Sequence, residues 1–154
     1  NPDTRHHYHH LFETQQIHKT YQAIAKIKNN KNLIGQEWQI KNRLERSDLR
    51  FMMRVTEGAA NSYSVIRCLQ QSAQKALFEL TPVTGKTHQL RVHMQSLGWP
   101  ILNDKYYPQL QPLSADNFSR PLQLLAKKLE FIDPITQQAR CFSYNGNLSL
   151  SDGE

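Results

Sequence analysis

The stretch that decides the fold and points to a site is TGKTHQLRVH, residues 84–93. Gly85 predicts a turn, and the polar residues that follow it enter the first turn of a predicted helix. Backbone N–H groups at a helix N-terminus carry partial positive charge, and Lys86 and Arg91 add two cations close by. The stretch therefore predicts a pocket for an anionic partner.

The helix that follows Gly85 is predicted to have two different faces. Three apolar residues recur at i, i+4 and i+7, the spacing of a stripe that faces a core: Leu90, Met94 and Leu97. His88, Arg91 and Gln95 are three and four residues apart, so they share another, polar face. Gly98 predicts the end of the helix. The apolar face would hold the polar face rigidly against a cleft.

Most of the remaining chain is predicted to form strands. Residues 17–27 alternate with period two, which places six residues on one face: Ile17, Lys19, Tyr21, Ala23, Ala25 and Ile27. Further strands are predicted at residues 37–41, 51–56, 62–70, 75–83 and 122–131, with a turn at 133–136 and a return strand through 140–144. A helix is predicted over residues 1–14. Runs of strands with only two helices indicate an α+β fold with a largely antiparallel sheet, in one domain over residues 1–154.

The composition fits a single basic domain. The chain has 154 residues, 38% of them hydrophobic, and a formal net charge of +6. Such a charge suits a polyanion such as nucleic acid, although scattered surface lysines would give the same balance. Cys68 and Cys141 lack the spacing of a zinc or disulfide site. No apolar run is long enough to span a membrane. We expect a soluble, cytoplasmic monomer.

The most basic segment is residues 41–50, with four cations: Lys41, Arg43, Arg46 and Arg50. It is either a phosphate-contacting loop or strand, or a solvated turn. We favour phosphate contact through Arg43 and Arg46, because a guanidinium donates two parallel hydrogen bonds to phosphate oxygens.

Several motifs resemble, in order, those of the RluA-like group of RNA pseudouridine synthases. Residues 84–93, LGWPILND at 97–104 and YYP at 106–108 resemble its signature, and KTYQA at 19–23 resembles its strand motif. Residues 121–126 and 133–136 resemble its C-terminal hairpin. The resemblance implies a pseudouridine synthase-like catalytic domain that isomerises a uridine in ribosomal or transfer RNA, without cofactor or metal.

The resemblance also implies roles for individual residues. Tyr21 would pack on a flipped uracil and take part in removing the C5 proton, although a tyrosine on this face could also be only a core residue. Arg91 would pair with a nucleophilic aspartate and keep it ionised. Three residues would bind the RNA backbone: Lys86, His88 and Gln89. Lys86 stands where the family more often has arginine. It therefore keeps the positive charge but cannot donate the two parallel hydrogen bonds of a guanidinium.

One family element is missing from the sequence. The nucleophile of these enzymes commonly lies in a His-x-Leu-Asp segment, and no such segment occurs here. Aspartates elsewhere in the chain, among them Asp3, Asp48, Asp104 and Asp133, stand in other contexts. Asp104 is predicted to anchor a turn. We therefore expect the aspartate upstream of Asn1, and no isomerase activity from this chain alone.

Two other functions share part of this sequence pattern. A catalytically inactive RNA-binding module of the same fold would share most of these motifs. A hydrolase using His88 or His93 is disfavoured, because no serine or cysteine lies in a nucleophile turn. Four clustered histidines fit a hydrophilic helix face better than a metal site: His6, His7, His9 and His10.

Overall fold

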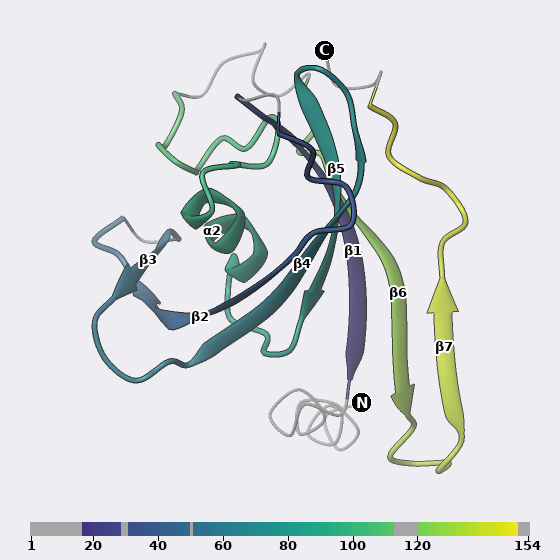
Figure 1. The fold of residues 1–154 in the computed structure, drawn as a ribbon. Coiled ribbons are helices and arrows are strands. Elements are labelled where there is room, and N and C mark those ends of the chain that lie inside the picture. The colour runs from purple at the N-terminus through teal and green to yellow at the C-terminus, as the bar shows by residue number, and fades with distance from the viewer. Residues whose placement is uncertain (1–16, 29–30, 50, 113–119, 151–154) are drawn as a thin grey trace.

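A computed structural model describes residues 17–28, 31–49, 51–112 and 120–150. These residues form a seven-stranded sheet in the order β3-β2-β4-β5-β1-β6-β7 (Figure 1). Every neighbouring pair of strands is antiparallel. The strands are β1 His18–Lys26, β2 Glu37–Arg46, β3 Met53–Thr56, β4 Ser62–Gln71, β5 Lys75–Pro82, β6 Leu124–Ile132 and β7 Ala139–Ser143. With helix α2, Gln89–Ser96, they confirm the predicted α+β fold with a mostly antiparallel sheet.

Strand β1 lies inside the sheet, between β5 and β6. The predicted strand is confirmed, and Ala23 and Ala25 are fully buried in the core that also contacts Tyr21, but Ile24 on the opposite face is fully buried as well. Lys19 and Tyr21, nearer the start of the strand, are only partly buried and line a pocket. One strand face therefore serves both the core and the pocket.

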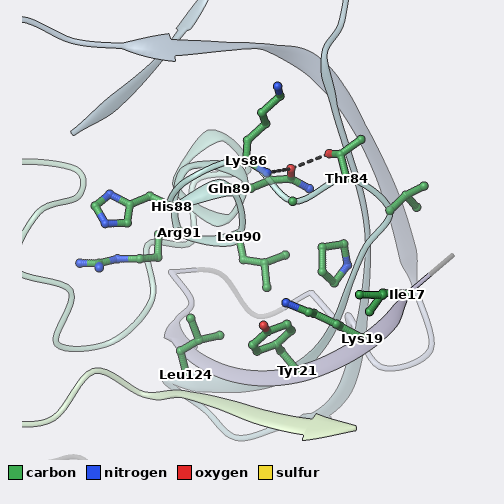
Figure 2. A pocket seen from close by; sticks show the side chains of 13 residues that line it. Ile17, Lys19, Tyr21, Thr84, Lys86, His88, Gln89, Leu90, Arg91 and Leu124 are labelled. Atoms are coloured by element: carbon green, nitrogen blue, oxygen red, sulfur yellow. Dashed lines mark hydrogen bonds between the residues drawn. The ribbon is translucent and has the colours of Figure 1, made fainter. Parts of the chain in front are cut away.

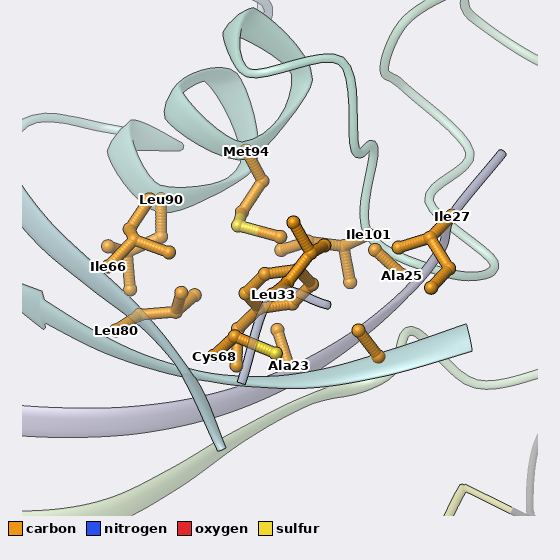
Figure 3. Close-up of a cluster of buried hydrophobic side chains, with 12 residues drawn as sticks. Ala23, Ala25, Ile27, Leu33, Ile66, Cys68, Leu80, Leu90, Met94 and Ile101 are labelled. Carbon is orange, nitrogen blue, oxygen red and sulfur yellow. The ribbon is translucent and has the colours of Figure 1, made fainter. Parts of the chain in front are cut away.

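Helix α2 covers the sheet with its apolar stripe. Leu90 and Met94 project from the helix toward the strands (Figure 3). They pack on buried residues of β1, β4 and β5: Ala23, Ile66, Cys68, Phe78 and Leu80. Burying a side chain of this size stabilises a fold by about 1.5–3 kcal/mol. The predicted core face of the helix is confirmed.

The end of α2 is fixed by backbone hydrogen bonds. Gly98 has φ +88°, and its N–H donates to the Gln95 carbonyl at 3.0 Å. The Trp99 N–H donates to the Met94 carbonyl, also at 3.0 Å. This pair of bonds is the Schellman motif, for which a glycine with positive φ is suited. The prediction that the helix stops at Gly98 is confirmed.

The basic segment at residues 41–50 departs from its prediction in extent. A strand was predicted to end at residue 41, but β2 continues to Arg46. The strand continues because Leu44 turns inward and is buried with Met52, Val92 and Tyr107. Of the described residues in this segment, Leu44 alone supplies its apolar contact, so the segment has little apolar content in the sequence.

The C-terminal hairpin forms as predicted. The Asp133 carboxylate accepts the N–H groups of Ile135 at 2.8 Å and Thr136 at 3.4 Å, which shapes the turn between β6 and β7. The predicted helix over residues 1–14 lies outside the described residues. In the described part of the chain, no helix has the length and apolar content to cross a bilayer.

Candidate active site

A pocket of about 490 Å³ lies where β1, the end of β5 and the start of α2 meet (Figure 2). Its lining includes five of the seven predicted site residues: Tyr21, Lys86, His88, Gln89 and Arg91. The other two, Arg43 and Arg46, are not among its lining residues. The structure therefore brings these five residues together around one pocket.

Tyr21 and Lys19 project into the pocket from β1 (Figure 2). Burial raises the pKa of the Tyr21 hydroxyl, because the phenolate would lose hydration. Burial lowers the pKa of the Lys19 ammonium for the same reason. Tyr21 therefore offers a flat ring and a neutral hydroxyl at neutral pH. Lys19 was not singled out as a site residue from the sequence, although it lies in the strand motif.

Gln89 fixes the loop that precedes α2. Its Oε1 accepts hydrogen bonds from the Thr84 hydroxyl at 2.5 Å and the Lys86 N–H at 3.1 Å. Its Nε2 donates to the Tyr63 carbonyl at 2.9 Å and the Ser64 hydroxyl at 2.8 Å. The side chain is buried, and both ends of its amide bond to protein. Gln89 thus holds the loop, and the structure offers no support for a direct RNA contact.

His93 extends this buried network toward β2. The Asn42 Oδ1 lies 2.9 Å from Nε2, and the Ser64 hydroxyl lies 2.8 Å from Nδ1. Because an amide oxygen only accepts, we assign the proton to Nε2, and Ser64 donates to Nδ1. Burial lowers the pKa of His93 to about 4, so the ring is neutral at pH 7. We call this chain of bonds, from Asn42 through His93, Ser64 and Gln89 to Thr84, the buried relay.

His88 stands at the N-terminus of α2 with φ 53°. The Tyr107 hydroxyl accepts the Met53 N–H at 2.8 Å and lies 2.9 Å from His88 Nδ1. The direction of the bond between the hydroxyl and Nδ1 depends on the tautomer of the ring, because the hydroxyl oxygen can accept a second hydrogen bond or donate its own. Burial and the neighbouring Arg91 lower the pKa of His88. His88 is then a neutral ring rather than a cation.

Arg91 binds a carboxylate of this chain. Its Nε donates to Asp104 Oδ2 at 3.0 Å, and its Nη2 donates to Oδ1 at 2.6 Å. The Asp104 side chain is fully buried and accepts the N–H groups of Tyr106 and Tyr107 at 2.9 and 3.1 Å. The prediction that Asp104 anchors a turn is confirmed, but its pairing with Arg91 was not foreseen. Figure 2 shows the guanidinium pointing away from Tyr21.

Arg43 and Arg46 lie on β2 and face opposite sides of the sheet. Arg46 shares its face with Leu44, which packs against α2, whereas Arg43 is three positions away and points to the reverse side. The Arg43 Nε also donates to Glu45 at 2.8 Å. The two arginines therefore do not form one patch.

Sequence comparison decides the family. Residues 1–96 match the family described as RNA pseudouridylate synthase, which is more than half of the chain. The chain belongs to this family. The resemblance drawn from residues 84–93 is thereby confirmed.

Relatives of this pseudouridylate synthase chain include two proteins named dual-specificity RNA pseudouridine synthase RluA. The one from Pasteurella multocida is 51% identical over 65 residues, which cover 42% of this chain and 28% of the relative. The one from Haemophilus influenzae is 40% identical over 85 residues, or 55% of this chain and 36% of the relative. The matched part spans about a third of these relatives at most.

Solved structures support the fold of the pseudouridylate synthase domain. The human RNA Pseudouridylate Synthase Domain Containing 4 superposes with a TM-score of 0.64 at 23% identity, covering 94% of this chain and 63% of that chain. The human Domain Containing 1 protein gives a TM-score of 0.63 at 21% identity, covering 88% and 58%. At these identities the likeness shows the fold alone.

A metal site has no support within the part of the pseudouridylate synthase chain that the structure describes. No three His, Cys, Asp or Glu side chains there lie close enough to share an ion. The predicted histidine cluster at residues 6–10 lies outside that part. His93, which could have served a hydrolase, is committed to the buried relay.

Proposed function

We propose that this chain forms the tyrosine and arginine side of the active site of an enzyme that converts a specific uridine to pseudouridine in ribosomal or transfer RNA. The observation that carries the proposal is the shared pocket. Tyr21, His88 and Arg91 line one cavity of about 490 Å³, within the usual size range of ligand pockets. They do so in a chain of the pseudouridylate synthase family.

The chemistry places demands that these side chains meet. A uridine must leave its stack to enter the pocket. An aspartate from outside this chain would attack it, the glycosidic bond would break, and the base would rotate and rejoin through C5, which then loses its proton. Tyr21 would hold the uracil ring and assist in the loss of that proton. Arg91 would keep the aspartate ionised and aimed, because an opposite charge within a few ångströms lowers a carboxyl pKa.

RNA backbone contacts would come from the rim of the pocket. Lys86 is exposed and precedes the N-terminus of α2, where the helix dipole favours an anion. His88 would contribute its Nε2, the ring nitrogen that does not face Tyr107. The proposal includes neither cofactor nor metal, and it takes the enzyme as a cytoplasmic monomer.

The 154-residue chain alone is expected to produce no pseudouridine, because in this proposal the nucleophilic aspartate is not part of it. We call this chain together with the proposed aspartate-bearing segment the full-length protein. The full-length protein should convert uridine to pseudouridine. The measurement is release of tritium from C5-labelled uridine in ribosomal and transfer RNA. Turnover by the isolated chain would rule out an external aspartate. Binding without turnover by the full-length protein would favour the alternative, an inactive RNA-binding module.

Arg46→Ala is expected to weaken RNA binding by the full-length protein and to reduce the slope of log K against log salt by about 1, as loss of one phosphate contact does. Arg43→Ala, also predicted to weaken binding, should have the smaller effect, since Arg43 bonds to Glu45 and faces the reverse side.

Arg67→Ala is the matched control for these two variants. Arg67 is an exposed arginine on β4 that pairs with Glu79 at 3.3 Å. Dissociation constants at several salt concentrations would test the prediction. Equal losses for Arg46→Ala and Arg67→Ala would show a nonspecific charge effect instead of a contact.

A further inference from the structure

Asp104 makes more bonds than an anchor for a turn requires. Its Oδ1 accepts two backbone N–H groups and also the Arg91 Nη2, while Oδ2 accepts the Arg91 Nε. The Asp104 side chain is 0% exposed and that of Arg91 is 15% exposed. The Tyr106 ring lies 4.6 Å from the Arg91 guanidinium carbon and covers one of its faces. The guanidinium is therefore restrained both in its plane and from one side.

We propose that Asp104 is a positioning residue of the pseudouridine synthase reaction, which fixes the Arg91 guanidinium so that its remaining N–H groups receive the nucleophilic carboxylate. This inference rests on the proposed function. A guanidinium has five N–H donors, and Asp104 takes the one on Nε and one on Nη2. The other three remain for an anionic ligand. An unrestrained arginine side chain samples many rotamers, and its bonds to Asp104 restrict that freedom before the ligand arrives.

Asp133 shows what a turn carboxylate looks like elsewhere in the same chain. Its Oδ1 also accepts two backbone N–H groups, those of Ile135 and Thr136. Its arginine, Arg140, is held more loosely, with Nε 3.8 Å from Oδ2. Asp133 lies at the β6–β7 turn and is not among the residues that line the pocket between β1, β5 and α2. The close, two-bonded arginine thus distinguishes Asp104 from a residue that only shapes a turn.

The test compares Asp104→Asn with Asp133→Asn in the full-length protein. The asparagine at either position keeps an oxygen for the backbone N–H groups and loses the charge. Asp104→Asn is expected to lower kcat about 10- to 100-fold, the usual effect of a misplaced catalytic group, and to change KM less than about twofold. Asp133→Asn should change kcat and KM less than about twofold. Equal kcat values for the two variants would overturn the proposal.

A double-mutant cycle tests whether Asp104 acts through Arg91. In an Arg91→Ala background, measured by single turnover with excess enzyme, Asp104→Asn should cause no further loss of rate. Additive losses would overturn the proposal, because Asp104 would then act by another route.

A spectroscopic readout separates this inference from the proposed function. In ¹⁵N-labelled full-length protein, the Arg91 Nε–H should exchange slowly with water, and Asp104→Asn but not Asp133→Asn should abolish that protection. If the unmodified protein makes no pseudouridine, the proposed function fails, and this readout still decides whether Asp104 positions Arg91. Rapid exchange in the unmodified protein, or protection that survives Asp104→Asn, would overturn the positioning role.

Discussion

Arg91→Ala in the full-length protein is expected to reduce pseudouridine formation at least about a hundredfold, since a catalytic carboxylate that is neither aimed nor kept ionised reacts poorly. The measurement is tritium release from C5-labelled uridine under single-turnover conditions. Arg91→Lys keeps the positive charge but loses the paired N–H donors of the guanidinium. Its activity should therefore lie between that of Arg91→Ala and that of the unmodified protein. Near-full activity of Arg91→Ala would show that the proposed role of Arg91 is wrong.

The same substitution should also destabilise the fold. The position of Arg91 on a polar helix face suggests from sequence that alanine is tolerated. The structure revises that expectation, because alanine would leave the buried Asp104 carboxylate without its cation. Breaking a buried pair costs about 3–5 kcal/mol. A loss nearer 2 kcal/mol is expected here, because Asp104 keeps two backbone N–H bonds. The double variant Arg91→Ala/Asp104→Asn should recover stability but not activity, which separates the two effects in thermal unfolding and turnover assays.

Lowering the pH from about 6.5 to about 4 is expected to remove roughly 3 kcal/mol of stability through His93 alone. The folded pKa is about 4, whereas an unfolded histidine titrates near 6.5. Between these values the unfolded chain binds a proton that the folded chain does not. This contribution is therefore fully present above pH 6.5 and is lost as the pH falls through the window.

Urea unfolding of the full-length protein at several pH values would measure this effect. His93→Gln, which cannot titrate, is the control variant, because the difference between the two proteins cancels the other acidic and basic groups. The pKa of His88 is also lowered, so His88 changes the free energy of unfolding with pH in the same direction in the unmodified protein and in His93→Gln. Parallel pH dependences for the two proteins would contradict the assignment to His93.

The parts of the fold that were predictable from sequence are those in which neighbouring residues carry the signal. Alternation along residues 17–27 identified β1, but not the burial of both its faces, which the structure shows at Ala23, Ile24 and Ala25. The i, i+4 spacing of Leu90 and Met94 identified the core face of α2. Glycine at position 98 identified the end of the helix, because the Schellman motif favours positive φ there.

The features that were missed depend on residues distant in the chain. The pairing of Arg91 with Asp104 requires the loop after α2 to fold back, which no local pattern encodes. Gln89 could be read as an exposed donor until Tyr63 and Ser64 of β4 were placed beside it. The opposite directions of Arg43 and Arg46 became evident only once β2 was found to extend past residue 41.

The buried relay has a consequence for how substrates are told apart. It ties the loop at Thr84 to β4 and, through His93, to β2, so that this wall of the pocket is built before any ligand arrives. A wall that is already ordered loses little conformational entropy on association. Under the proposed function, the deformation needed for binding then falls on the RNA, which must unstack one nucleotide. Discrimination between RNA sites should accordingly depend more on how readily each site unstacks its uridine than on conformational adjustment of the protein to each site.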